Sequence, residues 1–178
     1  MKKTIAVLVN YNNYQDTIEA IYSLLEQSYK IFKIIVVDNK STNDSFSILR
    51  AKFKDNKDII IIQTDKNNGF SYGNNFGFKY AFKNFNFDYF LMINNDTIAD
   101  SEINKNFIDY YEKNKNERIG ILTGKIFYYD ENNKIWFAGG YINKKKMIGY
   151  HIGIDTFENN NYNDIKYISF ATGCLWFF

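Results

Sequence analysis

The feature that most constrains the fold is an alternation, over the first hundred residues, between short apolar runs and segments with apolar residues at helical spacing. The runs predict buried strands at Ile5–Val9, Ile34–Val37, Ile59–Ile62 and Tyr89–Ile93. The segments predict helices near residues 18–25, 46–53, 71–82 and 101–114. Strand–helix–strand units of this length need right-handed crossovers, so the sequence predicts an α/β fold with a mostly parallel sheet.

The pattern changes after Gly120. Residues 121–129, 135–141 and 167–178 are rich in aromatic and β-branched side chains and are separated by Asn- and Gly-rich turns. Such segments are typical of mixed or antiparallel sheet. Because 178 residues suit one domain and no linker interrupts them, we expect one domain over 1–178 with a mixed C-terminal extension.

Charge and composition exclude several classes of protein. A net charge of +2 does not indicate nucleic-acid binding, and Lys144-Lys145-Lys146 predicts a solvated turn. Cys174 is the single cysteine, which predicts no internal disulfide and a reducing compartment. No run approaches about 18 apolar residues, so we expect no transmembrane segment. The prediction is a cytoplasmic protein, with peripheral contact at the inner face of the membrane left open.

Each predicted parallel strand is followed by polar residues. These groups are Asn10-Tyr11-Asn12, Asp38-Asn39, Asn67-Asn68-Gly69 and Asn94-Asn95-Asp96. Ligands of open parallel sheets bind beyond the carboxyl ends of the strands, so we expect the four groups to form one site. Asn is abundant throughout this proline-free chain, which makes any single Asn a poor indicator by itself.

Asp38 directly follows four β-branched residues and has two interpretations. Its carboxylate can accept hydrogen bonds from a pyrimidine or ribose, or it can cap the following helix. We assign the cap to Asn43 or Asp44 and a ligand role to Asp38.

Gly69, Gly73 and Gly77 are four residues apart, a spacing that matches neither the dinucleotide fingerprint nor the P-loop. Small residues on one helical face permit close packing against a strand or a ligand. Asn74 and Asn75 lie where side-chain amides can meet a diphosphate beside a helix N-terminus.

Asn94-Asn95-Asp96 also has two interpretations. One carboxylate flanked by amides suits Mg²⁺ or Mn²⁺, which keeps waters and takes phosphate oxygens as further ligands. The alternative is an Asx-turn that starts the next helix, with Thr97 or Ser101 as the cap.

Taken in order, these motifs resemble the family 2 glycosyltransferases of the GT-A fold, in particular the rhamnosyltransferase-like branch. The resemblance runs from Thr4 onward and includes two later segments, Ala138-Gly139-Gly140 and Ala171-Thr172-Gly173-Cys174. It implies that residues 1–100 are the nucleotide-binding half and that residues 101–178 begin the acceptor-side half.

The resemblance also implies roles for individual residues. The nucleotide-binding residues would be Asn10, Tyr11, Asp38, Asn39, Gly69, Asn74, Asn75, Asn94 and Asn95. Asp96 would hold the divalent metal, while Thr172 and Gly173 would line the donor-sugar pocket. Asn94 departs from the family's D-x-D motif, whose first residue is Asp.

The implied reaction is inverting transfer of a sugar from a UDP- or dTDP-sugar to a saccharide or lipid-linked saccharide acceptor, in bacterial surface polysaccharide synthesis. The catalytic residue is unknown: the family's base follows the Thr-Gly motif, and we expect it beyond Phe178. Asp155, Glu158 and Asp164 are substitute candidates, whereas His151 is expected to be structural.

Two alternatives remain open. In the first, the chain is a non-catalytic nucleotide-sugar-binding module or a truncated inactive fragment. In the second, it is a sugar-phosphate nucleotidyltransferase. The nucleotidyltransferase ranks last because Asn10-Tyr11-Asn12-Asn13 supplies no Gly-rich loop with Arg or Lys.

Overall fold

The protein is described by a computed structural model that covers residues 1–131 and 133–178. The four predicted parallel strands are confirmed, as β1 (Thr4–Asn10), β2 (Lys33–Asp38), β3 (Ile59–Gln63) and β4 (Tyr89–Ile93). The four predicted helices are also present, as α1 (Tyr14–Leu25), α2 (Ser45–Phe53), α3 (Phe70–Asn84) and α4 (Ile103–Lys113). The chain is therefore α/β, with the predicted alternation over its first half.

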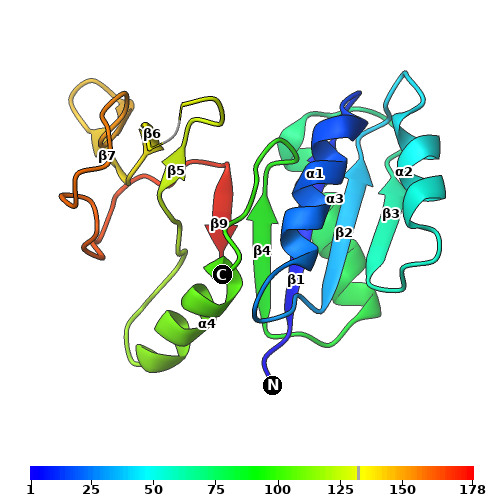
Figure 1. The fold of residues 1–178 in the computed structure, drawn as a ribbon, viewed down its shortest axis with the longest axis horizontal. Helices are drawn as coiled ribbons and strands as arrows, with labels where there is room; N and C mark the ends of the chain where they lie inside the picture. Colours follow the sequence, from blue (N-terminus) through cyan, green and yellow to red (C-terminus); the bar gives the residue numbers. More distant parts are fainter. Residues whose placement is uncertain (132) are drawn as a thin grey trace.

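The main sheet has the strand order β3-β2-β1-β4-β9, in which β9 (Leu175–Phe177) is antiparallel to β4. The other four strands are parallel, so their carboxyl ends lie along one edge (Figure 1). The register places Asn10 beside Asp38 and Asp38 beside Gln63. Polar residues that are far apart in the sequence are thereby aligned at the strand ends.

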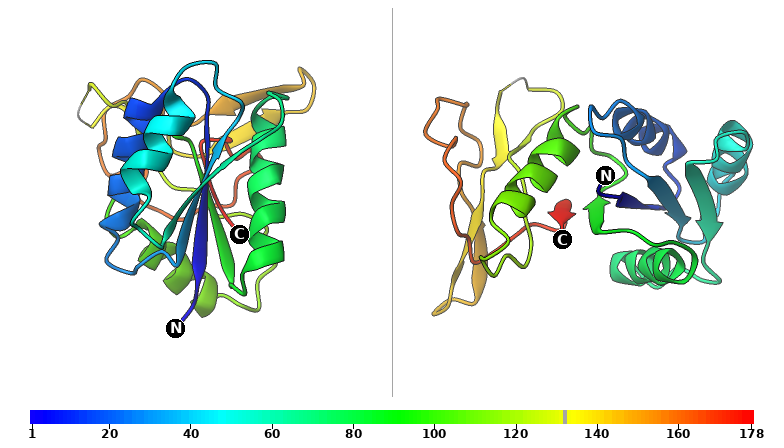
Figure 2. Two further views of the ribbon diagram at one scale, coloured as in Figure 1. Left: turned by 90° about the vertical axis from the view of Figure 1, so that its right-hand side faces the viewer. Right: turned by 90° about the horizontal axis from the view of Figure 1, so that it is seen from below.

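Helices cover both faces of this sheet. The hydrophobic cluster on one face contains side chains of α1, α2 and α4, and the cluster on the other face contains side chains of α3. Figure 2 shows α1 and α2 on one side of the sheet and α3 on the other. The strands are buried on both faces, which explains why their sequences are continuous apolar runs rather than alternating ones.

α3 lies against the sheet along a face of small residues. A Cβ on Gly73 would lie 2.7 Å from Val9 Cγ1, and one on Gly77 would lie 2.7 Å from Val7 Cγ1 and 2.9 Å from Val37 Cγ2. The glycine spacing therefore brings the helix axis close to β1 and β2, as one of the two sequence interpretations predicted.

The strands predicted after Gly120 are much shorter than expected. The structure has β5 (Ile126–Phe127), β6 (Ile135–Phe137), β7 (Gly140–Asn143) and β8 (Ile148–His151), paired as two antiparallel hairpins, β5–β6 and β7–β8. Of the predicted strand 167–178, only β9 forms. Several aromatic residues there pack in loops: the Phe170 ring stacks on His151 at 5.8 Å.

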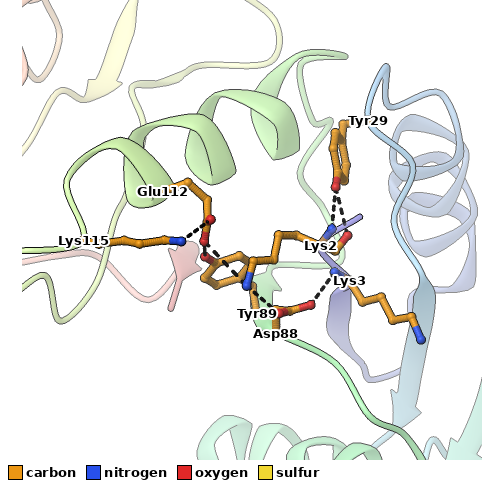
Figure 3. Close-up of polar contacts among 7 residues, drawn as sticks. All are labelled: Lys2, Lys3, Tyr29, Asp88, Tyr89, Glu112 and Lys115. Atoms are coloured by element: carbon orange, nitrogen blue, oxygen red, sulfur yellow. Dashed lines mark hydrogen bonds and ion pairs between the residues drawn. The ribbon is translucent and has the colours of Figure 1, made fainter.

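A polar cluster joins the opposite edge of the sheet to α4 (Figure 3). Lys2 Nζ donates to Asp88 Oδ1 at 2.8 Å, and the Lys3 main-chain N–H donates to Asp88 Oδ2 at 2.8 Å. The Tyr89 hydroxyl donates to Glu112, and burial raises the pKa of Tyr89. These contacts connect the start of β1, the start of β4 and α4.

We predict that Gly77→Ala lowers the free energy of unfolding by about 1–2 kcal/mol. Overpacking against Val7 and Val37 exceeds the gain of up to ~1 kcal/mol that Ala brings to a helix. Urea denaturation measures the change. Gly120→Ala is the matched control, because a Cβ there meets no atom within 4 Å. Equal stability of the two variants would contradict the close packing of α3.

The Lys2 and Lys3 contacts hold the pKa of Asp88 below its ordinary value of 3.8. A carboxylate with a lowered folded-state pKa stabilises the protein above its unfolded pKa and loses that effect as the pH falls. We therefore predict that Asp88→Asn is less stable than the wild type at pH 6, and that the difference shrinks as the pH falls below 3.8 and through the lowered pKa of folded Asp88. Denaturation over a pH series measures it, and a constant difference would contradict the assignment.

Candidate functional site

A buried carboxylate organises the carboxyl ends of the strands. Asp38 is fully buried at the end of β2, and its two oxygens accept four hydrogen bonds. Oδ1 accepts from the Ser41 N–H and Gln63 Nε2, each at 2.9 Å. Oδ2 accepts from Asn10 Nδ2 at 2.7 Å and Ser41 Oγ at 2.6 Å. These bonds compensate for the desolvation of the carboxylate and connect β1, β2 and β3.

A chain of hydrogen bonds extends this arrangement to β4. Asn10 is also fully buried, and its Oδ1 accepts from Thr17 Oγ1 of α1 at 3.0 Å. Asn95 Nδ2 donates to the same Thr17 Oγ1 at 2.9 Å. The Asn94-Asn95-Asp96 loop is thus connected to Asp38 through two intervening side chains. The structure therefore brings the predicted groups after β1, β2 and β4 together.

The loop after β1 is fastened to the loop after β2. Asn12 has a φ of 58°, in the left-handed region where Asn is among the favoured residues. Its Oδ1 accepts from the Thr42 N–H at 2.8 Å, and its N–H donates to Ser41 Oγ at 2.9 Å. Asp44, one of the two predicted caps, is the residue at the N-cap of α2, but its side chain forms no capping hydrogen bond. Asn43 Oδ1 instead accepts from the Ser45 N–H at 3.0 Å, just before the helix.

The group after β3 joins the site through Asn39. Its Nδ2 donates to Asn67 Oδ1 at 2.8 Å and to the Gly69 carbonyl at 3.1 Å. Gly69 has a φ of 84°, which favours glycine, and it immediately precedes α3. Asn39 thereby fixes where α3 begins.

The α3 N-terminus has no side-chain cap among the described residues. Its first-turn N–H groups and its dipole favour an anion there. Asn75 is exposed, whereas Asn74 is buried and donates from Nδ2 to the Phe70 carbonyl at 3.1 Å. Asn74 Oδ1 is buried without a described partner, so of the two amides only Asn75 is open to solvent. Tyr11 is 45% exposed at the same strand ends.

The distant Thr-Gly-Cys segment lies beside the Asn94-Asn95-Asp96 loop. The Asn94 N–H donates to the Cys174 carbonyl at 2.9 Å, and Thr97 Oγ1 lies 3.3 Å from Cys174 Sγ. Burial raises the pKa of the Cys174 thiol, and the negative charge of Asp96 adds to this shift. A Cβ on Gly173 would lie 3.7 Å from Phe70 at the start of α3. Gly173 therefore lies between this loop and α3, and the preceding residue, Thr172, is buried.

Asp96 is exposed and forms no hydrogen bond or ion pair with any described residue. Asn94 Oδ1 is buried and likewise has no partner in the described part of the chain. No group of three His, Cys, Asp or Glu side chains suited to a metal occurs within 1–131 and 133–178. One free carboxylate and one amide oxygen fit a hard cation that takes its other ligands from water and phosphate. They do not form an all-protein metal cage.

Two residues that complete the site were not predicted, Gln63 and Thr17. Gln63 ends β3 directly after four isoleucines, so its position at a strand end was visible in the sequence. Thr17 is fully buried on α1. Its role depends on how α1 is placed over the strand ends, which no local pattern reveals.

The substitute bases suggested by the sequence lie in loops of the C-terminal lobe, defined here as residues 121–171. Glu158 pairs with Lys125 at 2.5 Å, which holds the pKa of Glu158 below its usual value, and Asp155 pairs with Lys134 at 3.4 Å. No hydrogen bond in the described structure connects them to the strand ends. His151 Nδ1 lies 3.1 Å from the Trp136 carbonyl among aromatic rings, in agreement with a structural role.

Two relatives show what the sequence is similar to. The chain is 23% identical over 173 residues to Glycosyltransferase GlyG of Streptococcus pneumoniae, covering 96% of this chain and 54% of that protein. It is 29% identical over 121 residues to a poly-beta-1,6-N-acetyl-D-glucosamine synthase of Staphylococcus aureus, covering 67% of this chain and 28% of that protein. The chain thus spans about half the length of the first relative and less of the second.

Two solved structures share the fold. S. aureus TarS 1–349 in complex with UDP-GlcNAc has a TM-score of 0.54 and 21% identity over 64% of this chain and 32% of that one. Mannosyltransferase PcManGT from Pyrobaculum calidifontis, in complex with GDP-Man and Mn²⁺, has a TM-score of 0.60 and 16% identity over 71% of this chain and 36% of that one. The fold is of the GT-A type, as predicted.

The family itself is established by a match over almost the whole length of the sequence. The family model of Glycosyl transferase family 2 matches residues 5–178, from the second residue of β1 to the last residue of the chain. The ordered strand-end motifs, the GT-A fold and this match agree. The chain belongs to glycosyl transferase family 2.

Proposed function

We propose that this chain is the donor-binding part of an inverting glycosyltransferase that uses a UDP- or dTDP-sugar. The single observation that carries the proposal is in the loop after β4, at the carboxyl edge of the parallel sheet, where the exposed Asp96 carboxylate and the buried Asn94 Oδ1 both lack a partner among the described residues. The side chains of Asn10, Asp38, Asn39 and Asn95 are, by contrast, hydrogen-bonded within the protein. Asp96 is left available for a ligand.

The α3 N-terminus supplies the complementary charge for a diphosphate. The Asn39 contact and Gly69 set the position of the first turn, and Gly173 lies beside it at Phe70. A diphosphate between this turn and Asp96 would meet main-chain N–H groups on one side. The sugar would then lie against Thr172 and Gly173, and the exposed Tyr11 and Asn75 would contact the nucleoside end.

A divalent cation, Mn²⁺ or Mg²⁺, would be held by Asp96 with Asn94 Oδ1 within the same loop. When bound, such an ion neutralises the charge that develops on the departing diphosphate. The oxygen-only donor set fits both ions. The fold neighbour that contains GDP-Man and Mn²⁺ supports the use of a divalent ion.

Asp38, Asn10 and Asn95 affect nucleotide binding mainly by holding the surrounding loops in place, and less by direct contact. A direct contact between Asp38 and a nucleoside requires Ser41 or Gln63 to give up its hydrogen bond, because both carboxylate oxygens are occupied. In the bonded arrangement Asp38 keeps the loops after β1 and β2 at fixed positions. The loop that contains the exposed Tyr11 is thereby held in place.

In the transfer step the acceptor hydroxyl oxygen forms a bond to the anomeric carbon while the bond from that carbon to the diphosphate oxygen breaks. Attack from the face opposite the diphosphate inverts the configuration. The hydroxyl proton passes to a carboxylate on the acceptor side. The acceptor proposed is a saccharide or lipid-linked saccharide of bacterial surface polysaccharide synthesis, and the likeness to a poly-beta-1,6-N-acetyl-D-glucosamine synthase supports polysaccharide synthesis.

We predict that UDP or dTDP binds this chain in the presence of Mn²⁺, and that Asp96→Asn weakens this binding about tenfold or more. A tenfold loss corresponds to ~1.4 kcal/mol, in the range of one charge-assisted contact. Isothermal titration calorimetry with and without Mn²⁺ measures both effects. The variant should also lose most of the difference between the two conditions.

Asp109→Asn is the matched control, because Asp109 is an exposed carboxylate of α4 whose one ion-pair partner among the described residues is Lys105, at 3.1 Å. This variant changes the net charge equally and should bind as the wild type does. Absence of nucleoside diphosphate binding with and without Mn²⁺ would contradict the proposal. Binding without transfer or donor hydrolysis by the native full-length protein would favour the non-catalytic module.

A further inference from the structure

The β7–β8 hairpin is a distinct part of the C-terminal lobe, at the end of the molecule away from α2 and β3 (Figure 1). Its register pairs Tyr141 with Tyr150 and Asn143 with Ile148. Residues 144–147 form the turn, and Asn143 Oδ1 accepts from the N–H groups of Lys145 and Lys146, each at 3.1 Å. The turn is therefore an ordered structure.

Glycines determine which face of the hairpin is inward. A Cβ on Gly140 would lie 2.5 Å from Phe170 Cδ1, and one on Gly149 would lie 3.5 Å from the same ring. Phe170 therefore covers the face that carries Gly140 and Gly149. Because strand side chains alternate between faces, Tyr141, Tyr150 and Ile148 belong to the opposite face.

The outward face of the hairpin and Met147 of the turn present exposed apolar side chains. Tyr141 and Tyr150 stack at 5.2 Å with an angle of 15° between the rings. Tyr141 and Ile148 are each 49% exposed, and Met147 in the turn is 82% exposed. Met147 has a φ of 54°, a conformation that favours Gly or Asn over an unbranched apolar residue. Tyr141, Met147 and Ile148 thus give the hairpin an exposed apolar surface.

The charge on this hairpin has one sign. Lys144, Lys145 and Lys146 are exposed, and none forms an ion pair with a residue the structure describes. Residues 140–151 contain no Asp or Glu. Three free lysines thus adjoin Met147 and Ile148, with no carboxylate within the hairpin to offset them.

We propose that the β7–β8 hairpin docks the protein onto an anionic lipid surface. Lysines are attracted to acidic headgroups, and their apolar stems lie along the interface while the ammonium groups remain in water. Tyrosine rings suit the headgroup region, and Met147 and Ile148 would enter the upper acyl layer. This function is independent of the donor site, and no helix in the described ranges is long and apolar enough to cross a bilayer.

The hairpin is also placed to reach such a surface. The sheet and α1, α2 and α3 lie away from it, so the nucleotide-binding half does not come between the hairpin and a bilayer (Figures 1 and 2). A docked hairpin would hold the strand-end site close to the membrane, where lipid-linked saccharides are found.

Cosedimentation of the full chain with vesicles tests the proposal. We expect binding to vesicles of phosphatidylglycerol and phosphatidylcholine, and little binding to phosphatidylcholine alone. Replacing Lys144, Lys145 and Lys146 by Ser should lower the partition coefficient about 100-fold at low ionic strength. Raising the salt concentration should weaken wild-type binding.

A second pair of variants tests the apolar contribution. Met147→Ser should lower partitioning several-fold, about fivefold from the loss of partial burial of one side chain. Met147→Trp places a fluorescent indole in the turn, and lipids with brominated acyl chains should quench its emission. The wild-type chain gives the background signal of Trp136 and Trp176.

The matched control replaces Lys52, Lys54 and Lys57, three exposed lysines in and after α2, by Ser. It removes the same charge and should leave partitioning nearly unchanged. Equal losses in both triple variants, no effect of Met147→Ser, or no binding to anionic vesicles would each overturn the proposal. Calorimetry with UDP and Mn²⁺ should give wild-type values for every hairpin variant, so failure here is distinct from failure of the donor site.

Discussion

The architecture of the site depends on the burial of one carboxylate. Asp38 is removed from water at the end of a central strand, and a charge in that position is tolerated only if hydrogen bonds replace its hydration. Ser41, Asn10 and Gln63 provide these bonds. Since the donors come from β1, β3 and the loop after β2, satisfying the carboxylate also aligns the ends of three strands.

The close approach of α3 to the sheet likewise fixes the position of a part of the site, the helix N-terminus. Gly73 and Gly77 allow the helix to lie on β1 and β2, and Asn39 fixes its first residue through Gly69. The uncapped N-terminus of α3 is therefore held by packing against the sheet and by the hydrogen bond from Asn39 to the Gly69 carbonyl. A binding site made of main-chain N–H groups needs this rigidity, since it has no long side chains that could adjust.

The first half of the fold could be predicted because each of its strands is buried on both faces and so leaves a continuous apolar run in the sequence. The C-terminal lobe could not, since aromatic residues such as Phe170 pack in loops as readily as in strands. The pairing of β9 with β4 joins residues more than eighty positions apart, which no local pattern encodes. The strand-end groups were found from polarity alone, but the pairing of Gln63 with Asp38 depends on the sheet register. The role of Thr17 depends on how α1 is placed over the strand ends.

Packing and buried hydrogen bonds leave Asp96 and the α3 N-terminus available to bind a diphosphate and its metal ion. A crystal structure of this chain with UDP and Mn²⁺ tests this claim most directly. We expect a metal ion bound to Asp96 and a diphosphate between that ion and the first turn of α3. Nucleotide bound elsewhere, for instance in the groove of about 410 Å³ between residues 117–122 and 165–171, would contradict it.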